Sequence, residues 1–420
     1  MKRHLALLFA LALPLSAQIR QPAGAATPFE EPPTLRAADI LRPEFAAGPF
    51  HKVRDAVPTY AGANWFTIDS DFGVFEAEGN ALLAQRIAEI YAIAGLKEIS
   101  RGEQFGKAVA NAAKSPLLAA KSLITQPVKT VSAVPKGMWK MLTRVGQGAK
   151  EATQSRERSD YEDSKAKELI GVTKAKRELA SKLGVDPYSS NEALQRELNS
   201  ISWASFAGDT TVGVLFMAVG GGAGKALSVT GTIDRNQDRL RDSTPADIRR
   251  ENLSLLVEMG ITKDSANTLL NNSAFSPWHQ MNIVSALGAL EGVKGRADFL
   301  RLAAQVSEDE SDALFFEQTA ILIARVHAES AKLDRIVVRD GLPLCIARDG
   351  MVILALHWDY AAWTPRAAAF AAGLEKIAAK ESKKPALAVM LTGQISPLLR
   401  SELEARKFHV FDRVVPGPLK

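Results

Sequence analysis

The chain has 420 residues, of which 46% are hydrophobic and 24% charged, with a formal net charge of +5 and a single cysteine. This composition is typical of a globular protein and excludes a wholly disordered, a collagen-like or a disulfide-stapled chain. At about 100–200 residues per domain, the length predicts two or three folded units, each large enough to bury a core.

The N-terminus has the three parts of a secretory signal peptide. Lys2 and Arg3 precede an apolar run over residues 5–15, and the small residues before Gln18 suit a signal peptidase. The apolar run is shorter than the ~20 residues that a membrane-spanning helix requires. We therefore expect a signal peptide over 1–17 and an exported protein, either periplasmic or secreted, with a peripheral membrane location left open.

Residues 18–60 are rich in proline, which denies backbone donors and helical angles to its neighbours, so we interpret them as an extended tether. Aromatic and β-branched residues over 64–69 and 72–76 predict a small β-hairpin. An acidic cluster near this hairpin suggests either a cation site or a solvated turn, and it consists of Asp69, Asp71, Glu76 and Glu78.

Residues 101–150 are the most basic stretch, with nine Lys or Arg residues against Glu103 alone. A helix predicted near their end has apolar residues on one face and basic residues on another. Such a helix lies on an anionic membrane surface or packs on its own domain with a solvated basic face. The residues of this candidate membrane- or anion-binding site are Lys136, Trp139, Lys140 and Arg144.

The centre of the chain is predicted to be mainly α-helical. Residues 61–232 combine the hairpin with basic and glycine-rich helices, and the uncharged segment within 208–231 is either a core element or inserts into a membrane. Apolar residues at spacings of three and four then predict a helical domain over 233–332.

From residue 333 to 420 the pattern predicts an α/β domain. Alternating segments separated by Asp340-Gly341 and Asp349-Gly350 indicate a three-stranded meander, because Asp-Gly suits the turn of a hairpin. Two helices then alternate with two more strands, which gives the order α-βββ-α-β-α-β. The expected fold class is a mainly α-helical central region plus a C-terminal α/β sandwich, with a small N-terminal β-hairpin.

This order is similar to the restriction-endonuclease-like core, in which neighbouring strands carry a metal-binding aspartate and a Glu/Asp-x-Lys. The third strand here ends His357-Trp358-Asp359 and has no lysine to activate water. His357 and Asp359, two residues apart on one strand, point to one face and are candidates to share a metal or a proton. The alternative is an ordinary polar pair at the end of a strand.

Other motifs are incomplete. The glycine-rich segment 220–225 does not match the phosphate-binding loop motif. Val219 stands where the motif requires glycine, and Ala226 stands where it requires Ser or Thr. A calcium-loop spacing meets Arg239 and Pro245 where glycine and glutamate are required. Zinc, hydrolase and RNA-binding signatures are missing too, so we expect no nucleotide, no nucleic-acid partner, no cofactor and no metal site.

These patterns favour a non-enzymatic protein of the cell envelope with a binding or structural role. We expect it to associate with anionic lipid or with an envelope protein through its basic amphipathic helices. The alternative is an exported metal-dependent hydrolase whose site includes His357 and Asp359. The sequence leans away from an enzyme without deciding the question, and it identifies neither ligand, partner nor oligomeric state.

Overall fold

The computed structural model describes residues 29–102, 171–207, 211–212, 233–381, 386–415 and 417–420. The chain divides into two compact units, one made of Met1–Ile87 and Arg249–Lys420 and the other of Ala88–Ile248. Among the helices of the described residues, none combines the length and the apolar character needed to cross a membrane.

The first unit begins with a 6-stranded sheet in which every pair is antiparallel. Its central strand β5 alternates buried and partly exposed residues, which directs Asn64, Phe66 and Ile68 inward. Two short helices, α1 (Ala37–Ile40) and α2 (Pro43–Ala46), connect the first strands. The strands are β1 (Thr34–Arg36), β2 (Ala47–Gly48), β3 (His51–Val53), β4 (Ala56–Tyr60), β5 (Ala63–Ser70) and β6 (Gly73–Glu78).

The turn between β4 and β5 consists of two residues with positive φ, Ala61 at 51° and Gly62 at 88°. Both angles match the type I′ turn that follows the twist of a hairpin. Glycine is required at the second position for another reason as well, because a Cβ there would lie 2.8 Å from the Trp358 indole. The turn therefore packs directly against the end of the C-terminal sheet.

Helices occupy the middle of this unit, and polar residues begin several of them. Ser276 caps α14 by accepting from the His279 amide, and Asp309 caps α16 by accepting from Ser311 and Asp312. A single turn of π-helix, Val326–Ser330, ends the last helix. The helices are α13 (Lys263–Leu270), α14 (Pro277–Gly288), α15 (Arg296–Val306) and α16 (Glu310–Arg325).

The C-terminal part of the unit is a mixed 5-stranded sheet with the order β13-β11-β9-β8-β7. The strands β7, β8 and β9 form an antiparallel meander, while β9, β11 and β13 run parallel. Short strands β10 (Tyr360–Ala361) and β12 (Gln394–Ile395) form a separate parallel pair. The sheet strands are β7 (Leu333–Arg339), β8 (Leu342–Ala347), β9 (Val352–Leu356), β11 (Leu387–Leu391) and β13 (Phe408–Phe411).

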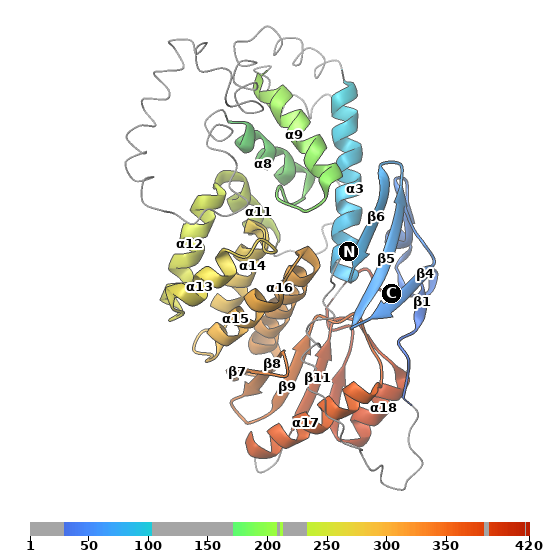
Figure 1. The fold of residues 1–420 in the computed structure, drawn as a ribbon, viewed down its shortest axis with the longest axis vertical. Coiled ribbons are helices and arrows are strands. Elements are labelled where there is room, and N and C mark those ends of the chain that lie inside the picture. Colours follow the sequence, from blue (N-terminus) through green and yellow to red (C-terminus); the bar gives the residue numbers. More distant parts are fainter. Residues whose placement is uncertain (1–28, 103–170, 208–210, 213–232, 382–385, 416) are drawn as a thin grey trace. The chain divides into compact units, whose positions relative to one another are not determined.

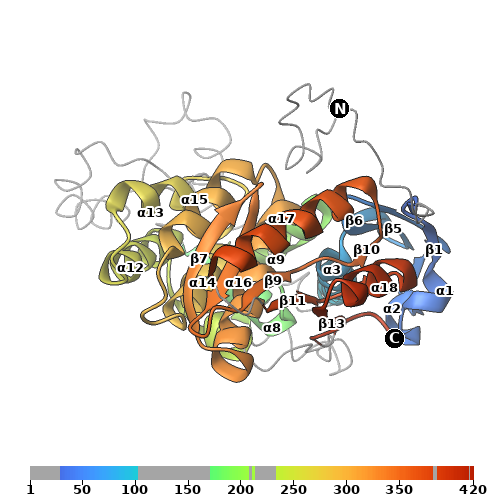
Figure 2. The same ribbon diagram turned by 90° about the horizontal axis from the view of Figure 1, so that it is seen from below.

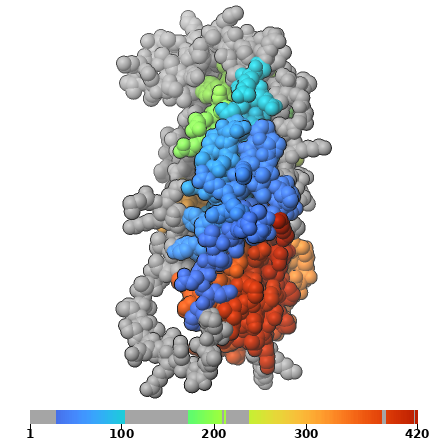
Figure 3. Space-filling model, turned by 90° about the vertical axis from the view of Figure 1, so that its right-hand side faces the viewer, coloured from blue at the N-terminus to red at the C-terminus, as the bar shows by residue number. Residues whose placement is uncertain are grey.

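Every residue of β8 and β9 is buried, because helices cover both faces of this sheet. Helices α15 and α16 contact β7 and β9, while α17 (Pro365–Glu381) contacts β9 and β11, and α18 (Pro397–Ala405) contacts β13 (Figures 1 and 2). One continuous apolar core joins the helices to the sheet. Figure 3 shows the N-terminal strands, in blue, directly against the C-terminal part, in red.

The second unit is helical where it is described. It contains α8 (Val172–Leu183), α9 (Glu192–Ala207) and α11 (Ile233–Asp242), together with parts of α3 (Asn80–Arg101) and α12 (Pro245–Glu258), which contribute residues to both units. Its buried charge is satisfied locally, since the fully buried Glu89 accepts hydrogen bonds from Ser189 and Asn191.

The fold class expected from the sequence is wrong. The small N-terminal hairpin is the β5–β6 pair of a six-stranded antiparallel sheet, and β1 to β4 lie within the stretch interpreted as a tether. Pro58 lacks a backbone N–H donor, yet it fits in β4. Strand β5 pairs only with Thr59 and Tyr60 of β4, so no hydrogen bond between these two strands is lost at Pro58. A mainly α-helical central region is not shown, because 103–170 and 213–232 lie outside the described residues. The C-terminal part is built on a mixed sheet.

One glycine substitution tests the close packing at the end of the sheet. A Cβ at Gly393 would lie 2.1 Å from the carbonyl oxygen of Asp359, so we expect Gly393→Ala to lower the free energy of unfolding by about 2–3 kcal/mol. The control is Gly373→Ala within α17, where no atom lies within 4 Å of an added Cβ. That change should raise stability by about 0.5–1 kcal/mol. Urea unfolding measures both, and equal stability of the two variants would contradict the packing.

Candidate functional site

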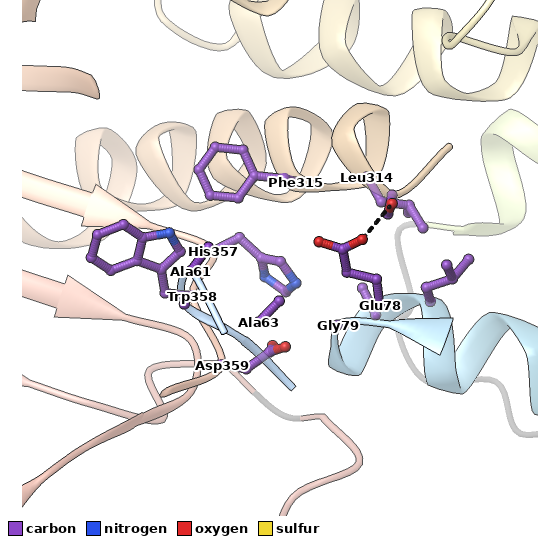
Figure 4. A pocket seen from close by; sticks show the side chains of 13 residues that line it. Ala61, Ala63, Glu78, Gly79, Leu314, Phe315, His357, Trp358 and Asp359 are labelled. Carbon is purple, nitrogen blue, oxygen red and sulfur yellow. Dashed lines mark hydrogen bonds between the residues drawn. The ribbon is translucent and has the colours of Figure 1, made fainter. Parts of the chain in front are cut away.

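A small cavity lies in the first unit, where the β4–β5 turn, the end of β6, the start of α16 and the segment after β9 meet (Figure 4). Its volume is about 30 Å³, which is enough for a water-sized group. We call it the acidic cavity, because Glu78 and Asp359 contribute carboxyl groups to its wall. It is lined by Ala61, Gly62, Ala63, Glu78, Gly79, Ala81, Leu82, Ser311, Leu314, Phe315, His357, Trp358 and Asp359.

The backbone after β9 is fixed from two sides. The Asp359 amide donates to the Gly62 carbonyl at 2.8 Å, which ties it to the N-terminal sheet. On the other side, the amides of Gly393 and Gln394 donate to the carbonyls of Trp358 and Asp359 at 2.7 and 2.8 Å. Because these bonds hold the main chain at Trp358 and Asp359, the Asp359 side chain has a defined direction into the cavity.

Asp359 is buried, with only 2% of its surface exposed. Its Oδ2 atom accepts hydrogen bonds from the backbone amides of Asn64 and Asn80, each at 3.0 Å. Asn80 is the first residue of α3, so the carboxylate lies at a helix N-terminus, where negative charge is favoured. Its Oδ1 atom has no hydrogen-bond partner among the described residues. Burial outweighs the two amide bonds and raises the pKa of Asp359 to about 7.

His357 faces the same cavity. Its Nδ1 atom lies 3.0 Å from the Thr392 hydroxyl, which is also 3.3 Å from the Trp358 carbonyl. When that hydroxyl donates to the carbonyl, Nδ1 carries the imidazole proton and Nε2 presents a lone pair. The Nε2 atom is buried and has no partner among the described residues. Burial lowers the pKa of His357 to about 4, so the ring is neutral at pH 7.

Glu78 approaches from the opposite wall, as the last residue of β6. Its carboxylate accepts a hydrogen bond of 3.5 Å from the Ser311 hydroxyl, drawn in Figure 4. Burial and the negative charges of Asp309, Asp312 and Asp359 raise the pKa of Glu78 to about 7. Burial also raises the pKa of Asp312 to about 7. The cavity is therefore an environment that disfavours ionised carboxyl groups.

These side chains do not form a metal site of the usual kind. Within the described residues, no group of three or more His, Cys, Asp or Glu side chains is arranged to hold a metal ion. The sequence-based alternative of a metal-dependent hydrolase thus has two candidate residues in one cavity and stays a prediction.

The structure brings His357 and Asp359 together, just beyond β9 rather than within it. The basic candidates Lys136, Trp139, Lys140 and Arg144 lie outside the described residues. Sequence reasoning missed the role of Glu78, which it noted only as part of an acidic cluster near a hairpin. Its sole local signal is the glycine that follows it, Gly79, whose φ of +95° turns the chain from β6 into α3.

Searches of protein-family models, curated proteins and solved structures give no match to this chain. The function therefore has to be inferred from the cavity and the sequence.

The pKa of Asp359 predicts how one substitution changes the pH dependence of stability. The folded chain holds a proton that the unfolded chain, with an ordinary pKa of 3.8, releases, so stability falls as pH rises from about 4 to about 7. Asp359→Asn removes this titration and keeps an oxygen for both amides. We expect the variant to be more stable than the unmodified chain by about 1–3 kcal/mol at pH 8 and equally stable at pH 4.

Urea unfolding at both pH values measures this difference. Asp264→Asn, which removes an exposed carboxylate on α13, controls for the lost charge. A variant that is destabilised at pH 8 would show instead that the two amides hold Asp359 ionised.

Proposed function

We propose that this chain is an exported, non-enzymatic binding protein of the cell envelope that holds a small polar ligand in the acidic cavity. One observation carries the proposal: two buried polar atoms in one cavity, His357 Nε2 and Asp359 Oδ1, have no partner among the described residues. Buried polar atoms are nearly always hydrogen-bonded, and leaving one unsatisfied costs about 1–3 kcal/mol. A ligand with donor groups would remove this cost.

The chemistry of the lining supports binding more than catalysis. With a pKa of about 4, His357 is a weak base at neutral pH and serves better as a hydrogen-bond acceptor than as a proton carrier. The lining contains one hydroxyl side chain, that of Ser311. It donates a hydrogen bond of 2.6 Å to Asp309 Oδ1 and is not paired with His357. A nucleophile and its base are therefore not assembled among these residues.

A panel of small molecules tests this proposal. It contains alkylamines, polyols, monocarboxylates, Mg²⁺, Mn²⁺ and Zn²⁺, each measured by its effect on the thermal unfolding midpoint. A ligand at ten times its Kd stabilises the folded chain by about 1.4 kcal/mol. We expect at least one class to do so in the unmodified chain and to lose its effect in Ala81→Leu, which fills the cavity from α3.

The matched control is Ala84→Leu, one turn further along α3 and outside the cavity lining. It should retain the effect. If no class shows this pattern, the cavity is not a binding site. If a divalent cation alone shows it, the metal-dependent hydrolase with His357 and Asp359 becomes the better proposal.

A second proposal concerns residues 101–150 and rests on their charge alone. We propose that this segment holds the exported chain at an anionic lipid surface, since each Lys or Arg near such a surface contributes about 1 kcal/mol. Mature protein should float with anionic vesicles, and less so at high salt, but not with neutral vesicles.

Charge reversal locates the contact. Replacing Lys136, Lys140 and Arg144 with Glu should weaken vesicle binding at least about 100-fold. The same change at three exposed lysines elsewhere, Lys174, Lys182 and Lys263, alters net charge equally and should have a much smaller effect. Equal loss in both variants would show that only net charge matters, and no flotation at all would refute the membrane proposal.

A further inference from the structure

On the basis of the proposed binding function, we infer that the ligand of the acidic cavity is the hydroxyl group of a small alcohol. The hydroxyl oxygen lies between His357 Nε2 and Asp359 Oδ1 and forms a hydrogen bond with each. Three features of the described residues support this ligand: the two polar atoms, the protons that they can give or accept, and the size and apolar character of the wall.

Two buried polar atoms in the cavity have no hydrogen-bond partner among the described residues, His357 Nε2 and Asp359 Oδ1. Both side chains come from the segment that follows β9, and Figure 4 shows the imidazole ring and the carboxyl group on the side of the cavity across from Glu78. Because a buried polar atom without a partner is costly, a ligand that pairs with both atoms gains more than one that pairs with either alone.

The two oxygens of Asp359 have different roles. Its Oδ2 atom accepts the backbone amides of Asn64 and Asn80, each at 3.0 Å. When the carboxyl group is neutral, its proton therefore belongs on Oδ1, because a proton on Oδ2 would compete with the two amides. Burial raises the pKa of Asp359 to about 7, so both the neutral and the ionised forms are populated at pH 7. Oδ1 is a donor in the first form and an acceptor in the second.

His357 can change its role in the same way. The Thr392 hydroxyl lies 3.0 Å from His357 Nδ1 and 3.3 Å from the Trp358 carbonyl, so it can donate to either. If it donates to the carbonyl, Nδ1 carries the imidazole proton and Nε2 accepts, whereas if it donates to Nδ1, the proton is on Nε2. A hydroxyl group donates and accepts through one atom. It therefore pairs with both Nε2 and Oδ1 whichever of the two is the donor.

The size and the lining of the cavity also suit an alcohol. A volume of about 30 Å³ fits a water-sized group such as a hydroxyl. The neighbouring wall is apolar and includes the side chains of Leu82, Leu314, Phe315 and Trp358. Water offers the same hydrogen bonds as a hydroxyl, but only an alcohol adds an alkyl group that is removed from solvent against this wall.

The test is an NMR titration of the protein at pH 7, followed at the Trp358 indole signal, which nitrogen-15 labelling of tryptophan provides and Trp358→Phe assigns. Ethanol is the expected ligand. Acetonitrile and ethylammonium have as many non-hydrogen atoms, but the first only accepts hydrogen bonds and the second only donates them. A ligand this small reaches a Kd of about 1 mM at best, which an NMR titration can measure.

We expect ethanol to bind at least about 10-fold more tightly than acetonitrile and ethylammonium, which corresponds to about 1.4 kcal/mol. tert-Butanol has the same hydroxyl on a bulkier group, so it controls for solvent effects and should give no saturable shift. A saturable shift with tert-butanol as strong as that with ethanol would overturn the inference.

Variants assign the binding to these side chains. His357→Phe removes Nε2 and should weaken ethanol binding about 10-fold and abolish the preference for ethanol over acetonitrile. Thr392→Val removes the hydroxyl that holds Nδ1 and should also weaken ethanol binding, whereas Thr392→Ser keeps that hydroxyl and should restore it. Circular dichroism confirms that each variant is folded. Ethanol binding that survives both His357→Phe and Thr392→Val would contradict the inference.

The remaining outcomes separate the ligand class from the proposed function. If acetonitrile or ethylammonium binds more tightly than ethanol, and Ala81→Leu abolishes that binding, the ligand class is wrong and the binding function stands. If no probe gives a saturable shift, the cavity holds water in place of an alcohol, and the inference is wrong. If the wider panel then also gives no cavity-dependent effect, the proposed function is wrong as well.

Discussion

The first unit depends on one buried carboxyl group. Through Oδ2, Asp359 accepts hydrogen bonds from the backbone amides of Asn64 in β5 and Asn80 at the start of α3, while its own amide donates to Gly62. These bonds join the end of the C-terminal sheet to the N-terminal sheet and to a helix. Removing the side-chain acceptor would leave two buried amides without a partner, which is costly. The same group places its second oxygen in the acidic cavity.

This arrangement gives the cavity its chemical character. The amides that hold Asp359 favour its ionised form, but burial outweighs them and raises its pKa. Burial also raises the pKa of Glu78, and neighbouring acids add to that shift. In the same cavity, Asp359 Oδ1 and His357 Nε2 have no hydrogen-bond partner among the described residues. The bonds to Gly62, Gly393 and Gln394 fix the main chain on which these side chains stand, so the binding that we propose would need no large rearrangement of the backbone.

Local patterns predicted part of this fold. The Asp-Gly pairs placed the turns between β7, β8 and β9, because turn preferences act over a few residues. The pair His357 and Asp359 was found from its spacing. The six-stranded sheet was missed, since its prolines resemble those of a tether. Glu78 was missed because its place depends on contacts such as that between Asn80 and Asp359, 279 residues apart.

The central claim is that Asp359 is a buried carboxyl group that joins two sheets and a helix through one oxygen and faces the acidic cavity with the other. Carbon-13 NMR of the protein, labelled at the aspartate side-chain carboxyl carbon and assigned through Asp359→Asn, tests it most directly. We expect the Asp359 signal to titrate with a pKa of about 7, because burial disfavours the ionised form. A signal that titrates near 4 would contradict the account.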